Sequence, residues 1–277
     1  MLRLSRRKCQ GRATGRKDGI ALSPSRTLPP PPGPGREPAI GEATAHDGDV
    51  HPQPVILALI PAHDEASRIG KVVRAAAAHV PVLVVDDGST DATAAEAETA
   101  GATVIRQHPN QGKGAALRAG FAHAIAEGTL AVVTLDADGQ HDPAELPRFL
   151  HAEHAHPGEL VIGRRDFGRM PLVRRLSNVA GTVLLSAAVG RWIPDNQSGY
   201  RLIGRRLMAA MLESREDGFA FEVEMIAVCL REGWPIGWVP ISTIYGDERS
   251  HIRPLRHLRE FVAVTRRARR IARGGPV

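Results

Sequence analysis

An α/β fold with a mostly parallel central sheet flanked by helices is predicted by three features of this 277-residue sequence. Short apolar runs alternate with helix-forming segments at the spacing of βαβ units. The first run is continuous rather than alternating, as expected for a strand covered on both faces. Acidic residues follow several of the runs, and ligands of open α/β sheets bind beyond the carboxyl ends of the strands. The sequence therefore predicts a fold and the edge that carries its site.

The elements follow one another regularly from residue 55 to residue 162. Val55–Ile60 is an apolar run that stops at Pro61, which is typical of a buried strand. Acids, glycines or capping hydroxyls separate the later elements. The predicted strands are 55–60, 82–85, 103–106, 130–135 and 160–162, and the predicted helices are 67–79, 89–100, 114–127 and 143–154.

Charge is divided unevenly along the chain. The whole sequence holds 36 basic and 30 acidic residues, a net charge of +6. Residues 1–50 hold nine basic and five acidic residues, residues 249–277 hold nine arginines and one acid, and the middle holds 18 basic and 24 acidic residues. A nucleic-acid binder is not indicated, because the middle of the chain is net acidic rather than basic. Aromatic residues, on which bases stack, make up only 4% of the chain. The basic ends are candidates for contact with an anionic membrane surface.

The same patterns predict the domain organisation. Residues 1–50 contain seven prolines and few large apolar residues, so we expect a disordered basic tail. We expect a single domain over 51–252 and an arginine-rich helix or tail over 253–277. No apolar run reaches the roughly 18 residues that span a bilayer, and the N-terminus lacks the apolar segment of a secretory signal. We therefore expect a cytoplasmic protein without a spanning helix.

The segment TLDADGQHDP, residues 134–143, holds the most informative acids. Asp136 and Asp138 follow a predicted strand two residues apart, so in extended backbone they point the same way. With the Gln140 carbonyl and His141 they suit Mg²⁺ or Mn²⁺, which keep open positions for phosphate oxygens. The alternative is an Asx-rich turn that caps the next helix. An EF-hand is excluded because its sixth and twelfth positions require Gly and Glu, whereas counting from Asp136 these positions are His141 and Pro147.

Two further motifs suit a phosphorylated ligand. Asp86 and Asp87 end a predicted strand, where a carboxylate accepts hydrogen bonds from a base or a ribose hydroxyl. A tight turn with an N-cap is the alternative. In NQGKGAALRAG, Gly112 and Gly114 allow a ligand to approach the backbone closely, and a helix N-terminus favours anions. Neither a Walker A motif nor a complete GxGxxG motif is present.

A family resemblance is carried, in order, by IPAHDE, VVDDGSTDAT, NQGKGAALRAG, LDADGQHDP, IGRR, DNQSGYRL and FAFEVE. Together these segments resemble a family 2 glycosyltransferase with a GT-A fold, and more closely the dolichyl-phosphate mannosyltransferase and polyprenyl-phosphate glycosyltransferase group. The resemblance covers Val55 to Arg253. It implies inverting, metal-dependent transfer of a sugar from a nucleotide-sugar, GDP-mannose or a UDP-hexose, to a polyprenyl phosphate at the cytoplasmic face of the membrane.

The resemblance also implies residues for the nucleotide side of the site. Pro61 and Glu65 match the motif that follows the family's first strand, with Glu65 as the ribose contact. Asp86 and Asp87 would contact the base and the ribose. Lys113 lies in the family's Gly-rich loop near the nucleotide.

The metal and the diphosphate are assigned by the same resemblance. Asp136, Asp138 and Gln140 match the family's metal motif, and Asp138 is the predicted catalytic residue among them. A nucleotide-sugar leaves a diphosphate whose growing negative charge requires Mg²⁺ or Mn²⁺ and basic groups.

Arginines after Gly163 indicate the acceptor. By resemblance, Arg165, Arg175 and Arg249 would neutralise an acceptor phosphate, with Arg165 and Arg249 as catalytic residues. A lipid phosphate is already anionic and needs arginines rather than a strong base. A hydroxyl acceptor would need a general base, and Asp195 is then the candidate. A nucleotide-sugar binding or scaffolding module without catalysis is a third reading, which these arginines disfavour.

Two segments are candidates for membrane contact. Leu172–Trp192 could form semi-apolar helices that lie in the membrane interface, with Arg174, Arg175 and Arg191 at their edges. The alternative is a core helix packed on the sheet. The arginine-rich helix expected over 253–273 would contact anionic lipid, remain solvated, or bind a membrane partner subunit.

Overall fold

The computed structural model describes residues 56–155, 160–170, 172–218, 220–242, 244 and 254–277. All of them belong to one compact unit, Val50–Val277. The tail expected over 1–50 lies outside the described residues, and so does Arg249.

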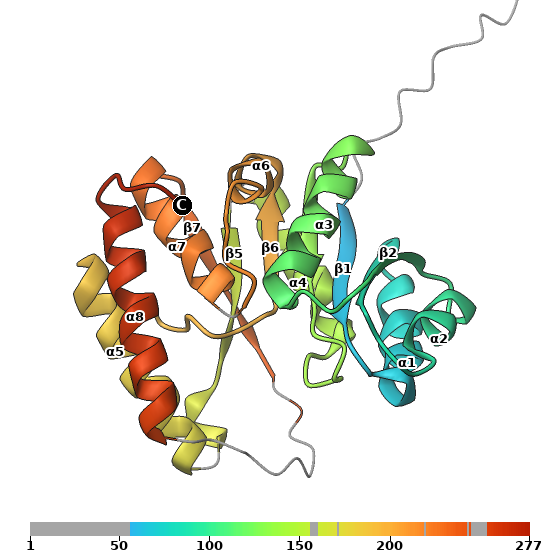
Figure 1. Ribbon diagram of the computed structural model, residues 1–277, viewed down its shortest axis with the longest axis horizontal. Helices are drawn as coiled ribbons and strands as arrows, with labels where there is room; N and C mark the ends of the chain where they lie inside the picture. The colour runs from blue at the N-terminus through green and yellow to red at the C-terminus, as the bar shows by residue number, and fades with distance from the viewer. Residues whose placement is uncertain (1–55, 156–159, 171, 219, 243, 245–253) are drawn as a thin grey trace, which may run out of the picture. The chain divides into compact units, whose positions relative to one another are not determined.

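The described part of the chain forms a seven-stranded sheet (Figure 1). Its strands lie in the order β3-β2-β1-β4-β6-β5-β7. The strand β6 pairs antiparallel with β4 and β5, and the other neighbours pair parallel. The strands are β1 (Ile56–Ala62), β2 (Val82–Asp87), β3 (Thr103–Gln107), β4 (Ala131–Thr134), β5 (Leu160–Arg165), β6 (Arg201–Gly204) and β7 (Ile236–Ile241). The predicted mostly parallel α/β sheet is confirmed.

Helices cover both faces of this sheet. They are α1 (Ala66–Ala77), α2 (Thr93–Thr99), α3 (Lys113–Ala126), α4 (Leu146–Ala155), α5 (Leu172–Val189), α6 (Arg205–Met211), α7 (Ala220–Glu232) and α8 (Pro254–Ala272). Short 3-10 turns, Pro143–Glu145 and Phe167–Arg169, precede α4 and α5. The expected helices from 67 to 154 therefore occur within a few residues of their predicted ends.

The alternation of side chains along the strands produces two cores, one on each face of the sheet. On β1, Leu59 packs with Phe121 of α3, whereas Ala58 and Ile60 pack with Ile69 of α1. All five side chains are fully buried. Because a strand covered on both faces needs apolar residues at every position, it appears in the sequence as a continuous apolar run.

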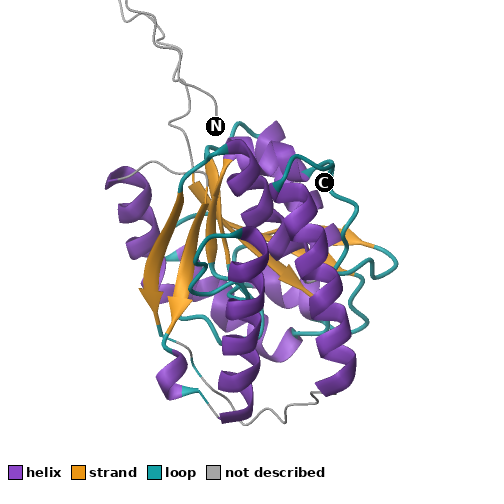
Figure 2. Cartoon of the chain, turned by 90° about the vertical axis from the view of Figure 1, so that its left-hand side faces the viewer, coloured by secondary structure: helices purple, strands orange, loops and turns teal. Residues whose placement is uncertain are grey.

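The helices α5 and α8 pack against each other beside the sheet (Figures 1 and 2). The helix α8 buries Thr265, Ala268 and Ile271 and exposes arginines on its other side. The segment expected over 172–192 forms one helix as far as Val189, which buries Leu185 but leaves Leu176 62% exposed. It is therefore not a wholly buried core helix. In the described residues, none of the helices combines the length and apolar character needed to cross a bilayer.

Several elements were not predicted. The strand β2 runs on through Asp86 and Asp87 rather than stopping before them. The antiparallel strand β6, the short helix α6 and the strand β7 had no assignment from the sequence. Thr134 of β4 is paired with Arg201 of β6, which places a charged residue inside the sheet.

Candidate active site

The candidate site lies where the parallel strands end. The strands β1 and β2 are in register, with Ala62 opposite Asp86, so the segments that follow them meet at one edge. Asp136 follows β4, and Arg165 is the last residue of β5. The chain thus brings acids and an arginine from four strands to the edge at which open α/β sheets bind ligands.

The segments after β1 and β2 are bonded to each other. Thr90 donates its backbone N–H to the Asp64 carboxylate at 2.7 Å, and Glu65 donates its N–H to the Thr93 hydroxyl at 2.7 Å. Asp64 has a positive φ of 54°, an uncommon conformation for a residue other than glycine. The Glu65 carboxylate accepts a bond from Arg68 at 2.9 Å, and Pro61 lies opposite Val85 near the end of β1. The two loops therefore act as one support beside the predicted nucleotide contacts Pro61 and Glu65.

The side chains of Asp86 and Asp87 are buried, and both carboxylates accept hydrogen bonds from backbone N–H groups of neighbouring loops. The Asp86 carboxylate accepts bonds from the backbone and the hydroxyl of Ser89. The two carboxylate oxygens of Asp87 accept the N–H groups of Gln111 and Gly112 at 2.8 and 2.7 Å. Asp87 therefore fixes the Gly-rich turn that carries Lys113, a supporting role in addition to the contact with base or ribose that its position predicts.

Lys113 forms the centre of a charged cluster. Its Nζ lies 2.5 Å from Oδ1 of Asp136 and 3.1 Å from Oε1 of Glu222, which is almost fully buried. Burial alone would lower the pKa of Lys113, but the two carboxylates raise it above its usual value. Burial would raise the pKa of Asp136, yet the charge and hydrogen bond of Lys113 outweigh burial and the pKa falls to about 2. Lys113 and Asp136 are therefore both charged at neutral pH.

His141 packs beneath this cluster as a neutral ring. The backbone N–H of Asp136 donates to Nδ1 of His141 at 3.2 Å, which places the ring proton on Nε2. Burial lowers the pKa of His141. The negative charge of Asp136 acts in the opposite direction but does not outweigh burial. A Cβ at Gly199 would lie 2.7 Å from a carboxylate oxygen of Asp136, so only glycine fits there without displacing it. His141 and Gly199 thus define the position of Asp136.

The turn after β4 differs from the extended backbone expected for Asp136 and Asp138. Asp138 accepts the N–H of Gln140 at 2.9 Å, and Gly139 has a φ of 76°. This is the Asx turn of the alternative interpretation, and Asp142 also caps the following 3-10 turn through Ala144. The extended arrangement was therefore wrong, because the strand ends at Thr134.

The oxygen atoms of this turn nevertheless suit a divalent cation. Asp136, Asp138 and Gln140 present carboxylate and carbonyl oxygens, which are the ligands that Mg²⁺ and Mn²⁺ prefer. In the ranges that the structure describes, no three His, Cys, Asp or Glu side chains form a group that could hold a metal ion. A cation would therefore need further oxygens, such as those of a diphosphate.

The partly buried Arg165 forms an ion pair with the buried Asp195. Nε and Nη2 of Arg165 donate to the two Asp195 oxygens at 2.8 and 2.9 Å, and the Arg165 N–H donates at 3.2 Å. Asp195 is 1% exposed. Arg165 also helps to lower the pKa of Asp136, so the pair lies within electrostatic range of the cluster. Arg175 is exposed on α5, one element further along the chain.

Some contacts of the site have no signal in the local sequence. The fully buried Arg201 donates to the carbonyls of Ser198, Glu222 and Asn196 at 2.7, 2.5 and 3.1 Å. This network holds Glu222 against Lys113. FAFEVE was singled out as a motif, but its partner lies more than 100 residues earlier in the chain.

The Gly-rich turn has a different neighbour from the one expected. Gly112 and Gly114 were interpreted as allowing a ligand to approach the backbone. In the structure the chain's own loop approaches them, since a Cβ at either glycine would lie 2.5 Å from a carbonyl oxygen of Asp217 or Glu216. Glycine is therefore required at both positions by internal packing.

Comparisons with known proteins show the family and the fold of the chain. Residues 58–211 match the model of "Glycosyl transferase family 2". The undecaprenyl-phosphate mannosyltransferase of Micrococcus luteus is 33% identical over 207 residues, covering 68% of this chain and 83% of that protein. The polyprenol monophosphomannose synthase of Mycolicibacterium smegmatis is 31% identical over 223 residues, covering 75% and 83%.

Two more similarities broaden the comparison. The UDP-N-acetylglucosamine–dolichyl-phosphate N-acetylglucosaminyltransferase of Methanococcus voltae is 28% identical, with 70% of this chain and 87% of that protein covered. Glucosyl-3-phosphoglycerate synthase of Mycobacterium tuberculosis has a TM-score of 0.63 at 22% identity, with 80% of this chain and 81% of that chain covered. Another structure of that synthase contains Mn²⁺ and UDP, with a TM-score of 0.59, 22% identity and coverage of 80% and 81%.

Proposed function

Because this chain belongs to glycosyl transferase family 2 and is a glycosyltransferase with a GT-A fold, we propose that it transfers one sugar from a nucleotide-sugar to a polyprenyl phosphate, inverting the anomeric carbon. The donor is GDP-mannose or a UDP-hexose. The reaction takes place at the cytoplasmic face of a membrane, to which the protein binds peripherally, alone or with a membrane partner subunit. The Arg165–Asp195 pair beside the Lys113–Asp136 cluster carries this proposal.

The cluster supplies the donor side of the reaction. Pro61, Glu65, Asp86 and Asp87 line or support the nucleotide at the ends of β1 and β2. Lys113 adds a fixed positive charge where the diphosphate departs, and its carboxylate partners hold it in place. Mg²⁺ or Mn²⁺, when bound through Asp136, Asp138 and Gln140, would neutralise charge on the leaving diphosphate.

The Arg165–Asp195 pair supports a phosphate acceptor. The two carboxylate oxygens of Asp195 accept bonds from Nε, Nη2 and the backbone N–H of Arg165. These bonds fix the orientation of the guanidinium group. A guanidinium oriented in this way suits the binding of an anionic phosphate oxygen, because arginine is always charged and its planar group matches phosphate geometry. A phosphate needs no proton removed, so no general base is required. In this mechanism Arg165, Arg175 and Arg249 neutralise the acceptor, and Asp195 positions Arg165.

A donor and acceptor screen tests the function. The full chain is incubated with polyprenyl phosphate, Mg²⁺ or Mn²⁺, and GDP-mannose, UDP-glucose or UDP-N-acetylglucosamine in separate reactions. We expect one donor to give a lipid-linked sugar of the corresponding mass. Turnover on free polyprenol or sugar hydroxyls, with none on the lipid phosphate, would contradict the proposal.

Variants of Arg165 and Asp195 distinguish the two acceptor classes. We expect Arg165→Ala to raise KM for the lipid phosphate and to lower kcat by about 10²-fold, because one charged transition-state contact is lost. Asp195→Asn should lower activity less and leave the pH dependence of kcat unchanged, because the amide oxygen still accepts one bond from Arg165. If Asp195→Asn removes an ionisation from the pH–rate profile, Asp195 is a general base and the acceptor is a hydroxyl.

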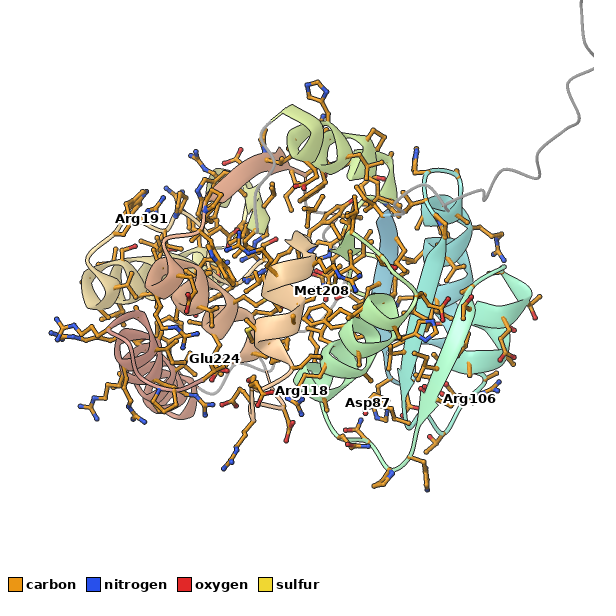
Figure 3. All side chains as sticks on the ribbon, turned by 90° about the horizontal axis from the view of Figure 1, so that it is seen from above. Asp87, Arg106, Arg118, Arg191, Met208 and Glu224 are labelled. Carbon is orange, nitrogen blue, oxygen red and sulfur yellow. The ribbon has the colours of Figure 1, made fainter. Side chains whose placement is uncertain are left out.

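An apolar face of α5 supports the peripheral membrane contact. This face consists of Leu176, Val179, Val183 and Leu184, all exposed and spaced as one side of a helix. Arg191 follows the helix at its outer end (Figure 3). Arg269 and Arg270 of the adjoining α8, and Arg273 just after it, are exposed and add positive charge worth about 1 kcal/mol each near an anionic surface. Apolar residues with arginines beside them suit the interface of an anionic bilayer.

Vesicle binding tests this membrane contact. We expect the protein to co-sediment with vesicles of phosphatidylcholine and phosphatidylglycerol more strongly than with phosphatidylcholine alone. The double variant Leu176→Glu/Val183→Glu should weaken binding by about tenfold or more, because two apolar contacts become charged. Leu130→Glu is the matched control, since Leu130 is 48% exposed but lies before β4 rather than on α5. Equal loss in both variants would contradict the assignment of the face.

A further inference from the structure

Arg267 of α8 connects the C-terminal helix to a loop beside the candidate site. Its Nε forms an ion pair with Oε1 of Glu224, and its Nη1 lies 3.0 Å from Oε2 of Glu216. The Glu224 side chain is only 2% exposed, and the Ser214 hydroxyl donates to it at 2.6 Å. Ser214 also accepts the Glu216 N–H at 3.2 Å. One guanidinium thus binds both a buried residue of α7 and the segment 214–217, here called the bridging loop.

The bridging loop is bound on its other side to the first turns of α3. Gly114 donates its N–H to the Asp217 carbonyl at 2.7 Å. Arg118 donates to the Glu216 carbonyl at 2.5 Å and forms an ion pair with the Asp217 carboxylate. The loop therefore fits between α3 on one side and α7 with α8 on the other. In Figure 3, Arg118 lies between Glu224 and Asp87.

The turn that receives these contacts carries Lys113. Asp87 binds the N–H groups of Gln111 and Gly112 just before it, and Asp217 binds the N–H of Gly114 just after it. The turn is thus held from two sides, by β2 and by the bridging loop. The 2.5 Å contact from Nζ of Lys113 to Asp136 depends on where this turn lies.

We propose that Arg267 is a positioning residue that keeps the Lys113 turn in place through the bridging loop. Arg267 lies outside the residues that match the family model, 58–211, so the C-terminal helix supplies a part of the site that the matched segment does not contain. The role of the turn in catalysis rests on the proposed function, but its positioning by Arg267 does not.

Hydrogen exchange of the full chain tests the positioning directly. We expect Arg267→Ala to speed amide exchange in peptides covering residues 112–118 by about tenfold, because the bridging loop opens locally more often. Exchange in β1 and β4 should remain unchanged. Arg231→Ala is the matched control, since Arg231 also pairs with a glutamate, Glu232, and is similarly exposed, but lies away from the loop. Unchanged exchange over 112–118 in Arg267→Ala would overturn the proposal.

A second variant separates positioning from misfolding. Arg267→Ala leaves the Glu224 carboxylate buried without its ion-pair partner, and burial already raises the pKa of Glu224. Arg267→Ala/Glu224→Gln removes that charge, while the amide can still accept a bond from Ser214. We expect this double variant to have a melting temperature nearer that of the unchanged protein and still to show faster exchange over 112–118. Restored protection over 112–118 would mean that the unpaired charge, not loss of positioning, opened the turn.

Kinetics extend the test to the reaction. We expect Arg267→Ala to reduce kcat/KM for the nucleotide-sugar by about 10- to 100-fold through misplacement of Lys113, with KM for the lipid phosphate unchanged. Arg267→Lys should recover part of this loss by restoring one ion pair. If the unchanged protein transfers no sugar to polyprenyl phosphate, yet exchange over 112–118 responds to Arg267→Ala, the proposed function fails and the positioning stands. If the protein is active and Arg267→Ala changes neither exchange nor kinetics, the positioning fails alone.

Discussion

Asp138→Ala is expected to lower kcat for sugar transfer by about 10²–10³-fold, the range for losing one group that stabilises developing charge. Asp138 lies in the turn after β4, two residues beyond the Asp136 that pairs with Lys113. In the proposed mechanism, Asp138 would provide oxygen ligands for Mg²⁺ or Mn²⁺ together with Asp136 and Gln140. The described residues offer no group of three His, Cys, Asp or Glu side chains that could hold a metal ion, so we expect the loss of one of the two carboxylates to be severe.

Asp142→Ala is the control for the structural part of this effect. Asp138 accepts the N–H of Gln140 at 2.9 Å, and Asp142 accepts the N–H of Ala144 at 3.0 Å. Each variant therefore loses one of these two matched local bonds, which costs about 0.5–2 kcal/mol of stability. We expect similar melting temperatures for the two variants but a large loss of turnover in Asp138→Ala only.

Chelation completes the test of the metal. EDTA should abolish turnover by the unchanged protein, and added Mg²⁺ or Mn²⁺ should restore it. Excess metal should restore little activity to Asp138→Ala, because the ligand itself is missing. Full activity in EDTA, or an Asp138→Ala variant as active as Asp142→Ala, would rule out the assigned metal site.

The parallel half of the fold could be predicted because its signals are local. Each buried strand is a continuous apolar run, and the acids that follow it indicate which edge carries the site. The motifs predict both Asp136 and Lys113 as site residues, and in the structure Nζ of Lys113 lies 2.5 Å from Oδ1 of Asp136. The contact itself was not predicted, since the turn and the strand end lie in different motifs.

The antiparallel part could not be predicted because its determinants are distant contacts. The strand β6 is four residues long and begins with Arg201, and isolated arginines are usually solvated. Asp195 was a candidate general base, and only the fold reveals that Arg165, 30 residues earlier, binds both of its oxygens. Gly112 illustrates the same limit, because the loop that excludes a side chain there lies about 100 residues further on.

Arg201→Leu is expected to lower the free energy of unfolding by about 3–5 kcal/mol, the largest stability effect that the site offers. Arg201 is fully buried, and its side chain donates to the carbonyls of Ser198, Asn196 and Glu222. Burial lowers the pKa of the Arg201 guanidinium, and the charges of Glu222 and Asp195 oppose that shift. Leucine fills part of the space but leaves three carbonyl oxygens without these donors.

Arg205→Leu provides the comparison that separates burial from hydrogen-bond number. Arg205 donates to the carbonyls of Thr129 and Ile125, both at 3.0 Å, but is exposed. Water can replace its bonds, so we expect a loss of only about 1 kcal/mol. Urea unfolding followed by circular dichroism measures both variants. Equal losses would mean that Arg201 contributes no more than a surface arginine. The expected difference would instead indicate that the buried guanidinium joins the segment 196–198 to Glu222, and so helps to hold the partner of Lys113.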